Sequence, residues 1–359
     1  MSERTEHTMN STPEGGLPGI HDAVVIGGGA AGLSGALTLG RARRSVLVID
    51  AGEPRNAPAA AVHAYLGHEG TPPGELLAAG RAEVLGYGVE LRAGTAVAAQ
   101  REGEAFRVTL ADATEVRARR LLVTTGLVDE LPDLPGLAEL WGTDVLHCPY
   151  CHGWEVRDRA VGVLGTGPLA VHQALLWRQW SDDVTLFRHT LDELDERSHE
   201  ELAARGVRVV AGEVVGLAAR DGRLTGVRLV DGTLIGRQVL VVAGKLTPRA
   251  GVLSSLGIEP TELEMGGTVI GAHIAADPTG ATAVPGVWVA GNVASPTDQV
   301  VAAAAAGVRA GAAINADLIA EETRAAVVAR RATLAGAPFS AESERAVAEV
   351  VLGHRRHGL

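Results

Sequence analysis

The stretch HDAVVIGGGAAGLSGALTLGRARRSVLVIDAG, residues 21 to 52, decides the fold of the chain. An apolar run from Ala23 to Ile26 enters the glycine pattern Gly27-x-Gly29-x-x-Gly32, and a second apolar run ends in Asp50. Strand, glycine turn, helix, strand and acid in this order form the full fingerprint of a dinucleotide-binding unit. A glycine-rich turn without a ligand is the alternative, but it does not account for this combination of elements.

Each residue of the fingerprint has a predicted role. Gly27 permits the tight turn, Gly29 lets a pyrophosphate approach the backbone, and Gly32 lets helix and strand pack closely. The N-terminus of the following helix presents free N–H groups and a positive dipole end to the phosphates. Asp50 is predicted to accept hydrogen bonds from the adenosine ribose.

A second copy of the pattern begins at Ala160. Residues 160 to 190 read AVGVLGTGPLAVHQALLWRQWSDDVTLFRHT, with glycines at Gly165 and Gly167 and a later apolar run from Val184 to Phe187. Each copy is followed by short alternating segments that end in a small glycine turn, VTTG at residues 123 to 126 and VVAG at 241 to 244. The segments after the second copy contain the turn signals Asp221-Gly222 and Asp231-Gly232. An internal duplication of a nucleotide-binding unit explains both halves.

The domain organisation follows from the segment after the second copy. Residues 284 to 319 contain an apolar run, a Gly291-Asn292 turn and an alanine-rich helical stretch, but no glycine fingerprint, so they are expected to complete the first domain. The prediction is an α/β fold with two Rossmann-like three-layer domains, the second inserted in the first. The first comprises residues 19–127 and 248–320, and the second residues 128–247. Residues 1–18 are predicted to be a disordered tail and residues 321–359 a C-terminal helical extension.

Composition narrows the classes of function. The net charge of −11 and the pI near 5.6 argue against a nucleic-acid partner. No apolar run approaches the roughly 18 residues that a membrane helix needs, and the N-terminus lacks the apolar region of a signal peptide. We therefore expect a cytoplasmic protein with no membrane partner.

Both cysteines of the chain lie in HCPYCHGWE, residues 147 to 155, as Cys148 and Cys151 between His147 and His152. The spacing alone fits a zinc site, a covalently attached haem or a redox-active disulfide. Haem attachment needs export, for which the sequence shows no signal, and zinc would need four ligands from two adjacent pairs, which is strained. Two buried structural thiols remain an alternative. In a cytoplasmic protein, a C-x-x-C ahead of a helix-forming unit favours a redox pair, and no metal site is predicted.

These motifs in this order resemble the low-molecular-weight thioredoxin reductase family, class II of the pyridine nucleotide-disulfide oxidoreductases, over about residues 19 to 320. The histidine directly after the second cysteine resembles a branch that includes the flavin-dependent dithiol oxidases of gliotoxin and holomycin biosynthesis. The resemblance implies that the first unit binds FAD, that the second binds NADPH, that the cysteine pair lies against the flavin, and that the protein is a homodimer.

The resemblance also implies the residues of the FAD site. These are the fingerprint residues, two later glycine turns and the start of the last helix: Gly27, Gly29, Gly32, Asp50, Gly126, Gly291, Asn292, Gln299 and Val300. Asn292 stands where the family usually has Asp, which keeps an acceptor and removes a charge beside a phosphate. The dipole of the last helix would stabilise the anionic reduced flavin.

The second nucleotide site is less complete. Gly165, Gly167 and Arg188 are the residues expected to hold NADPH, because arginine at this position accommodates a 2′-phosphate. NADPH-using relatives generally have a pair of arginines there, whereas this chain has Arg188 and then His189. Pro168 also removes one N–H from the pyrophosphate-binding turn. The sequence leaves open whether this site binds NADPH or is vestigial.

The family order implies that Cys148 exchanges with the substrate and that Cys151 faces the flavin. His152, with an ordinary pKa of about 6.5, is the predicted base, and His147 is either a second base or a supporting residue. The leading prediction is oxidation of a small-molecule dithiol to a disulfide, with FAD as cofactor and O2 as acceptor. The alternatives are NADPH-dependent reduction of a thioredoxin-like protein and a non-catalytic flavin redox sensor.

Overall fold

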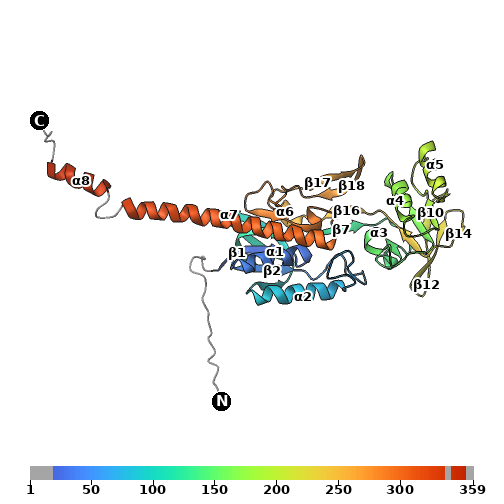
Figure 1. The fold of residues 1–359 in the computed structure, drawn as a ribbon, viewed down its shortest axis with the longest axis horizontal. Coiled ribbons are helices and arrows are strands. Elements are labelled where there is room, and N and C mark those ends of the chain that lie inside the picture. Colours follow the sequence, from blue (N-terminus) through green and yellow to red (C-terminus); the bar gives the residue numbers. More distant parts are fainter. Residues whose placement is uncertain (1–18, 336–340, 353–359) are drawn as a thin grey trace, which may run out of the picture. The chain divides into compact units, whose positions relative to one another are not determined.

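The computed structural model describes residues 19–335 and 341–352, so the predicted disordered tail, residues 1–18, lies outside the described residues. The contacts between residues divide the chain into two compact units, which meet between Ala312 and Ala313. The first unit holds both predicted nucleotide-binding motifs and the cysteine pair (Figure 1). No helix among residues 19–335 and 341–352 combines the length and the apolar character needed to cross a membrane.

The opening stretch folds as predicted, into a strand, a helix and a parallel strand. β1 is the centre of a sheet in the order β3-β2-β1-β6-β5-β4, in which β19 also pairs with β6. Its strands are β1 (Ile20–Ile26), β2 (Val46–Asp50), β3 (Glu90–Ala93), β4 (Ala96–Glu102), β5 (Ala105–Leu110), β6 (Glu115–Val123) and β19 (Val287–Val289). β1, β2, β3, β6 and β19 run parallel, and β19 comes from a segment distant in the sequence, as predicted. Because the inner strands are buried on both faces, they are continuous apolar runs.

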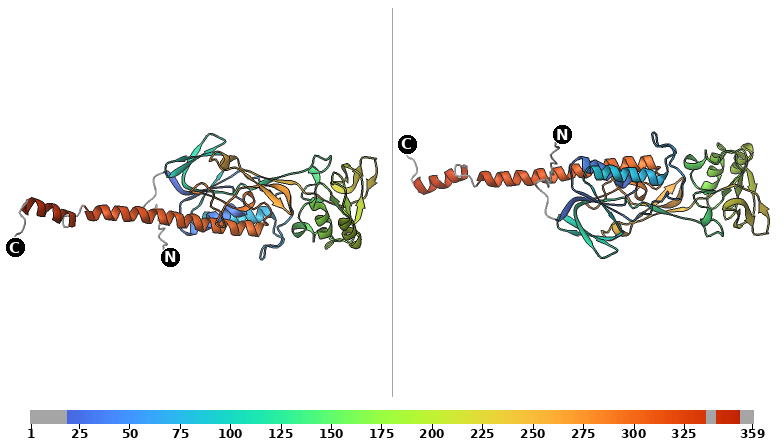
Figure 2. Two further views of the ribbon diagram at one scale, coloured as in Figure 1. Left: turned by 90° about the horizontal axis from the view of Figure 1, so that it is seen from above. Right: turned by 90° about the horizontal axis from the view of Figure 1, so that it is seen from below.

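Helices α1 (Ala30–Arg41), α2 (Pro73–Gly86) and the first part of α7 (Val300–Ala335) lie on the same side of this sheet in both views of Figure 2. Glycines bring α1 and α7 into backbone contact. A side chain at Gly307 would come within 1.9 Å of the carbonyl oxygen of Ala31, and one at Gly311 within 2.8 Å of the carbonyl oxygen of Gly35. Glycine within the alanine-rich helix is therefore a packing requirement that holds α7 against the nucleotide-binding helix.

The second glycine motif lies in a parallel sheet of its own, in the order β11-β10-β9-β15-β8. Its strands are β8 (Val145–Leu146), β9 (Val161–Leu164), β10 (Val184–Phe187), β11 (Arg208–Val210) and β15 (Val239–Val241). The helices of this part of the chain are η1 (Ala138–Leu140), α3 (Pro149–His152), α4 (Leu169–Trp177) and α5 (Glu196–Ala204). Asp195 caps α5 by accepting the N–H of Ser198 at 2.7 Å. The duplication of a nucleotide-binding unit is thus visible in the fold.

Two smaller sheets complete the first unit. One is antiparallel, with β12 (Val214–Arg220), β13 (Arg223–Leu229) and β14 (Leu234–Ile235), and the predicted Asp221-Gly222 and Asp231-Gly232 turns join its strands. The other has the order β17-β18-β16-β7, with β7 (Leu127–Glu130), β16 (Lys245–Pro248), β17 (Thr261–Met265) and β18 (Thr268–His273). α6 (Gly251–Ser254) follows β16, and η2 (Gly291–Val293) follows β19 of the first sheet. In the antiparallel pair β7 and β16, the chain leaves the part of the fold that holds the first glycine motif along β7 and returns to it along β16. The predicted domain boundaries fall within these two strands.

The second unit begins inside α7, which runs without a break to Ala335, so the predicted boundary at residue 320 lies within this helix. Helix α8 (Ala341–Leu352) lies in the segment predicted to be a C-terminal helical extension. Its side chains Val347, Val350 and Val351 are exposed.

Replacing Asp144 by alanine is expected to lower the free energy of unfolding by about 3 kcal/mol, because this acid is buried and its partners are fixed to it. Its carboxylate is 1% exposed and accepts both guanidinium N–H groups of Arg223, at 2.8 and 2.7 Å, and the N–H of Leu224 at 2.9 Å. Urea unfolding measures the loss. Asp182→Ala is the matched control, since the Asp182–Arg178 pair is at the surface. Its loss should lower the free energy of unfolding by less than about 0.5 kcal/mol. Equal midpoints for the two variants would contradict the buried role of Asp144.

Candidate active site

A cavity of about 1350 Å³ is lined by the first glycine turn, the ends of β2 and β6, the start of α7 and the cysteine segment. It brings together most residues that the sequence singled out: Gly27, Gly29, Asp50, Gly126, Cys148, Cys151, His152, Gly291, Asn292, Gln299 and Val300. Gly32 is not among the lining residues. The structure therefore joins the predicted flavin-binding residues and the predicted redox pair in one continuous space.

The glycine turn is built by close backbone contacts. Gly27 has a φ of +110°, and a side chain there would come within 2.5 Å of the carbonyl oxygen of Thr124. A side chain at Gly32 would come within 1.9 Å of the carbonyl oxygen of Gly27, which explains why Gly32 packs behind the turn instead of lining the cavity. A side chain at Gly29 would have no neighbour within 4 Å, so the backbone of Gly29 is open to the cavity. Each glycine thus serves a different steric need.

Asp50, at the end of β2, lines the cavity beside this turn. One carboxylate oxygen accepts the N–H of Gly28 at 3.0 Å. A side chain at Gly28 would meet the Asp50 carboxyl group at 2.7 Å, so glycine is needed at this middle position of the turn as well. The hydrogen bond from the glycine turn therefore fixes the Asp50 carboxylate at the wall of the cavity.

Asn292 organises the loop that leads into α7. Its amide group donates to the carbonyl oxygens of Ser295, Pro296 and Asp298 at 3.1, 3.3 and 2.9 Å. An aspartate would place a second acceptor against these three carbonyls, so the amide donor gives a structural reason for Asn that the sequence did not reveal. Gln299 and Val300 follow this loop at the N-terminus of α7.

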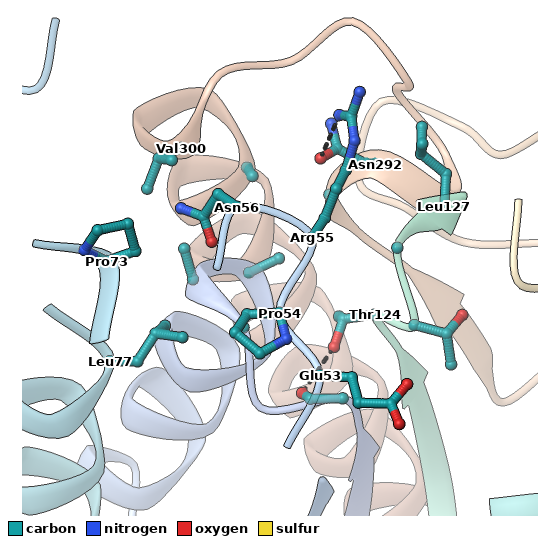
Figure 3. Close-up of a pocket in the computed structure, with 18 of the residues that line it drawn as sticks. Glu53, Pro54, Arg55, Asn56, Pro73, Leu77, Thr124, Leu127, Asn292 and Val300 are labelled. Atoms are coloured by element: carbon teal, nitrogen blue, oxygen red, sulfur yellow. Dashed lines mark hydrogen bonds between the residues drawn. The ribbon is translucent and has the colours of Figure 1, made fainter. Parts of the chain in front are cut away.

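Arg55 connects the flavin side of the cavity to the cysteine side and was missed in the sequence. Its guanidinium makes two hydrogen bonds with the carboxylate of Asp129 at 2.7 and 2.6 Å, and it donates to the side-chain oxygen of Asn292 at 3.4 Å (Figure 3). Such a planar, two-pronged pair has a fixed geometry. Arg55 lies in a segment without regular structure and belongs to no motif, so only its proximity to partners 74 and 237 residues away reveals it.

The cysteine pair begins the short helix α3, with Cys148 as its N-cap. Both cysteines are free thiols, and the Cys151 thiol donates to the Cys148 sulfur at 2.7 Å. This hydrogen bond is the main cause that lowers the pKa of Cys148 to about 7, with help from the backbone N–H groups of Cys151 and Tyr150 and from the charge of Arg55. The same hydrogen bond, together with burial, raises the pKa of Cys151. The reduced pair therefore carries its negative charge on Cys148 and its proton on Cys151.

The two histidines beside the pair differ in their surroundings. Burial is the main cause that lowers the pKa of His147 to about 4, and its ring stacks on Trp141 with the ring centres 5.6 Å apart. Burial also lowers the pKa of His152, whereas the nearby charge of Glu155 raises it. Both imidazoles are neutral at pH 7. A carboxylate favours the protonated form of each, Asp129 for His147 and Glu155 for His152, but His147 is the more buried and is also opposed by the charge of Arg55.

The second glycine motif does not reach this cavity, as Gly165, Gly167 and Arg188 are absent from its lining. A side chain at Gly165 would come within 2.7 Å of the carbonyl oxygen of Arg188. The guanidinium of Arg188 pairs with Glu193 at 2.5 Å. His189, in the position of a second arginine, accepts the N–H of Val214 at 3.1 Å with its ring nitrogen Nδ1. Arg188, which was predicted to face a 2′-phosphate, and the neighbouring His189 thus both have partners within the protein.

Among residues 19–335 and 341–352, no group of three or more His, Cys, Asp or Glu side chains is arranged to hold a metal ion.

Comparison with known proteins agrees with these features. The family described as pyridine nucleotide-disulphide oxidoreductase matches residues 21–309. The chain is 33% identical to thioredoxin reductase tcpT of Claviceps purpurea, over 67% of this chain and 78% of the relative. It is 31% identical to thioredoxin reductase sirT of Leptosphaeria maculans, over 83% of this chain and 94% of the relative.

Solved structures give the same result. The crystal structure of HlmI superposes with a TM-score of 0.82 at 47% identity, covering 89% of this chain and 98% of HlmI. An oxidoreductase from Agrobacterium tumefaciens superposes with a TM-score of 0.78 at 36% identity, covering 84% of this chain and 99% of that one. The chain therefore belongs to the pyridine nucleotide-disulphide oxidoreductase family, and it is a flavin-dependent thiol-disulfide oxidoreductase of the thioredoxin reductase type.

Proposed function

We propose that this protein oxidises a small-molecule dithiol to a disulfide, with bound FAD as the electron carrier and O2 as the final acceptor. The observation that carries the proposal is His152, a neutral imidazole directly after a cysteine pair whose outer thiol is readily ionised. A neutral imidazole can remove protons from an incoming dithiol, which is the direction that oxidation requires. We also propose a cytoplasmic homodimer.

The cavity fits FAD. Its volume of about 1350 Å³ exceeds the roughly 300–1,000 Å³ of an ordinary small-molecule site. The open backbone at Gly29 would face the pyrophosphate, and Asp50 would hold the adenosine ribose. Asn292 and the N-terminus of α7 would lie toward the flavin end, and Arg55 would hold that end against the cysteine segment. When bound, FAD supplies the two-electron acceptor that links the cysteine pair to O2.

The protein residues account for the exchange with the substrate. In the oxidised pair, a substrate thiolate attacks the Cys148 sulfur and breaks the Cys148–Cys151 bond, and the leaving Cys151 thiolate takes up a proton. The second substrate thiolate attacks the substrate sulfur bonded to Cys148, which closes the product disulfide and releases Cys148 as a thiolate. Two electrons pass to the pair, one of the two substrate protons stays on Cys151, and the other leaves through His152. The pKa directions of the two cysteines match this final state.

The competing function is NADPH-dependent reduction of a thioredoxin-like protein, which Arg188 favours. The partners of Arg188 and His189 within the protein count against it, because a 2′-phosphate would have to displace Glu193 and would gain only one arginine.

Anaerobic mixing separates the two functions. We expect a dithiol such as dithiothreitol to bleach the bound flavin, NADPH to bleach it at least about a hundredfold more slowly, and readmitted O2 to restore the colour with formation of hydrogen peroxide. Arg188→Ala serves as the control and should leave the dithiol reaction unchanged. Rapid bleaching by NADPH but not by dithiols would establish the reductase instead.

A further inference from the structure

A second, smaller cavity of about 170 Å³ lies beside the redox helix. Its wall combines aromatic side chains with two acids and a histidine: His63, Ala64, Glu69, Pro149, Tyr150, Trp154, Glu155 and Trp180. We call it the aromatic-acidic cleft. None of its aromatic or acidic side chains was assigned a role above except Glu155, which acts on His152.

The aromatic wall is exposed yet held in place. The side chains of Tyr150 and Trp154 are 62% and 65% exposed, which is unusual for rings of this size. Tyr150 packs edge-to-face on Trp180, with the ring centres 5.6 Å apart. Arg157 covers one face of the Trp154 ring at 4.1 Å and donates to the Trp154 carbonyl oxygen at 2.7 Å. Rings fixed in this way bind a flat molecule with little loss of side-chain entropy.

The cleft is also lined by acidic side chains. His63 lies between two carboxylates, with its Nδ1 2.7 Å from Glu69 and its Nε2 3.4 Å from Glu155. Glu69 also accepts the N–H of Ala64 at 2.8 Å, which fixes the carboxylate. Whether His63 is neutral or protonated, these three side chains together carry a net negative charge, and the neighbouring guanidinium of Arg157 is held against the Trp154 ring and its carbonyl oxygen. A carboxylate on a ligand would be repelled here, whereas a neutral or cationic group would not.

The cleft adjoins the redox cavity. His63, Pro149 and Tyr150 line both spaces, and Pro149 and Tyr150 are the two residues between the cysteines. A molecule that rests on Tyr150 therefore lies next to the pair with which its thiols would exchange.

We infer that the aromatic-acidic cleft is the subsite for the body of the dithiol substrate, and that it selects flat, uncharged or cationic scaffolds over those with a carboxylate. This inference rests on the proposed dithiol oxidation. The rings of Tyr150 and Trp154 contact the scaffold, while Glu69 and Glu155 exclude anions. The cleft thus determines specificity, and the cysteines and His152 carry out the exchange.

Two pairs of dithiols test the inference in steady-state oxidation. Dihydrolipoamide and dihydrolipoate differ only in a terminal amide or carboxylate, and we expect KM to be at least about fivefold lower for the amide. Glu69→Gln keeps the hydrogen bonds to Ala64 and His63 but removes a charge, so it should reduce this ratio to about twofold or less. Raised salt should reduce it in the wild type as well. An equal KM for the two compounds in the wild type would overturn the selection against carboxylates.

The second pair compares o-xylylenedithiol, which carries a benzene ring, with dithiothreitol, which has none. Trp154→Ala should raise KM for the aromatic dithiol about tenfold, with kcat and the kinetics of dithiothreitol unchanged, and Trp154→Phe should restore most of the loss. Tyr87→Ala removes another exposed ring, at the end of α2, and should change neither. A similar change for both dithiols in Trp154→Ala would refute the subsite while leaving dithiol oxidation intact. If no dithiol is oxidised by the wild type, the proposed function fails and the subsite falls with it.

Discussion

Replacing Cys148 by serine is expected to lower dithiol oxidation by at least about a thousandfold, because a hydroxyl group cannot form the disulfide through which the electrons pass. The fold and the flavin site should be unaffected, since Cys148 only begins a four-residue helix at the edge of the cavity. Cys151→Ser should abolish turnover to a similar extent. The measurements are the rate of disulfide formation and the visible spectrum of the bound flavin.

The two single-cysteine variants should nevertheless differ in reactivity. In Cys151→Ser the remaining Cys148 keeps a hydroxyl donor in place of the thiol, together with the backbone N–H groups of residues 150 and 151, which lower its pKa. In Cys148→Ser the remaining Cys151 is held by burial at a raised pKa. A chromogenic disulfide such as Ellman's reagent should therefore label Cys151→Ser much faster than Cys148→Ser at pH 7. Equal rates, or the reverse order, would assign the exchange with substrate to Cys151.

Replacing His152 by glutamine is expected to lower the rate of the substrate exchange by about a hundredfold or more at pH 7, because the general base is lost. In the wild type the rate should rise with pH as His152 loses its proton and reach a plateau above that pKa. Since burial lowers this pKa, the rise should lie below the ordinary imidazole value of about 6.5. The pH dependence of single-turnover flavin bleaching by a dithiol measures it, and the acidic limb should be missing in His152→Gln.

Glu155→Gln tests whether the acidic limb of the pH dependence belongs to His152. The charge of Glu155 raises the pKa of His152, so its removal should move the acidic limb to lower pH. Asp158→Asn is a suitable control, since Asp158 is an exposed acid of the same segment and is not among the groups that shift His152. A limb that stays in place in Glu155→Gln, or that persists in His152→Gln, would assign the titration to another group.

Local patterns were sufficient for the elements of the fold. The strands around both glycine motifs, the turns at Asp221-Gly222 and Asp231-Gly232, and the return of β19 to the first sheet agree with the sequence-based prediction. Apolar runs, glycine spacing and turn dipeptides act over a few residues, so the chain itself carries this information. Helix α7 continues past residue 320, where the first domain was predicted to end, because residues 321–335 contain no glycine or proline that would stop it.

The residues of the candidate site fall into two groups, those that belong to a sequence motif and those that do not. The glycines, Asp50 and the cysteine pair belong to motifs, so their residue types and spacing were enough to single them out. Arg55 and its partner Asp129 belong to none, and neither do His63, Glu69 and the rings that form the aromatic-acidic cleft. Their significance depends on contacts between segments that are far apart in the sequence.

The sequence by itself determined that this protein has two Rossmann-like units and a C-x-x-C cysteine pair between them, because short-range sterics and backbone conformation require those residues at those spacings. Only the tertiary structure decided which thiol has the lowered pKa, which histidine is the less buried, and that Arg188 is paired within the protein. Proton affinity and charge pairing depend on burial and on distances of a few ångströms, and these quantities exist only once the chain has folded.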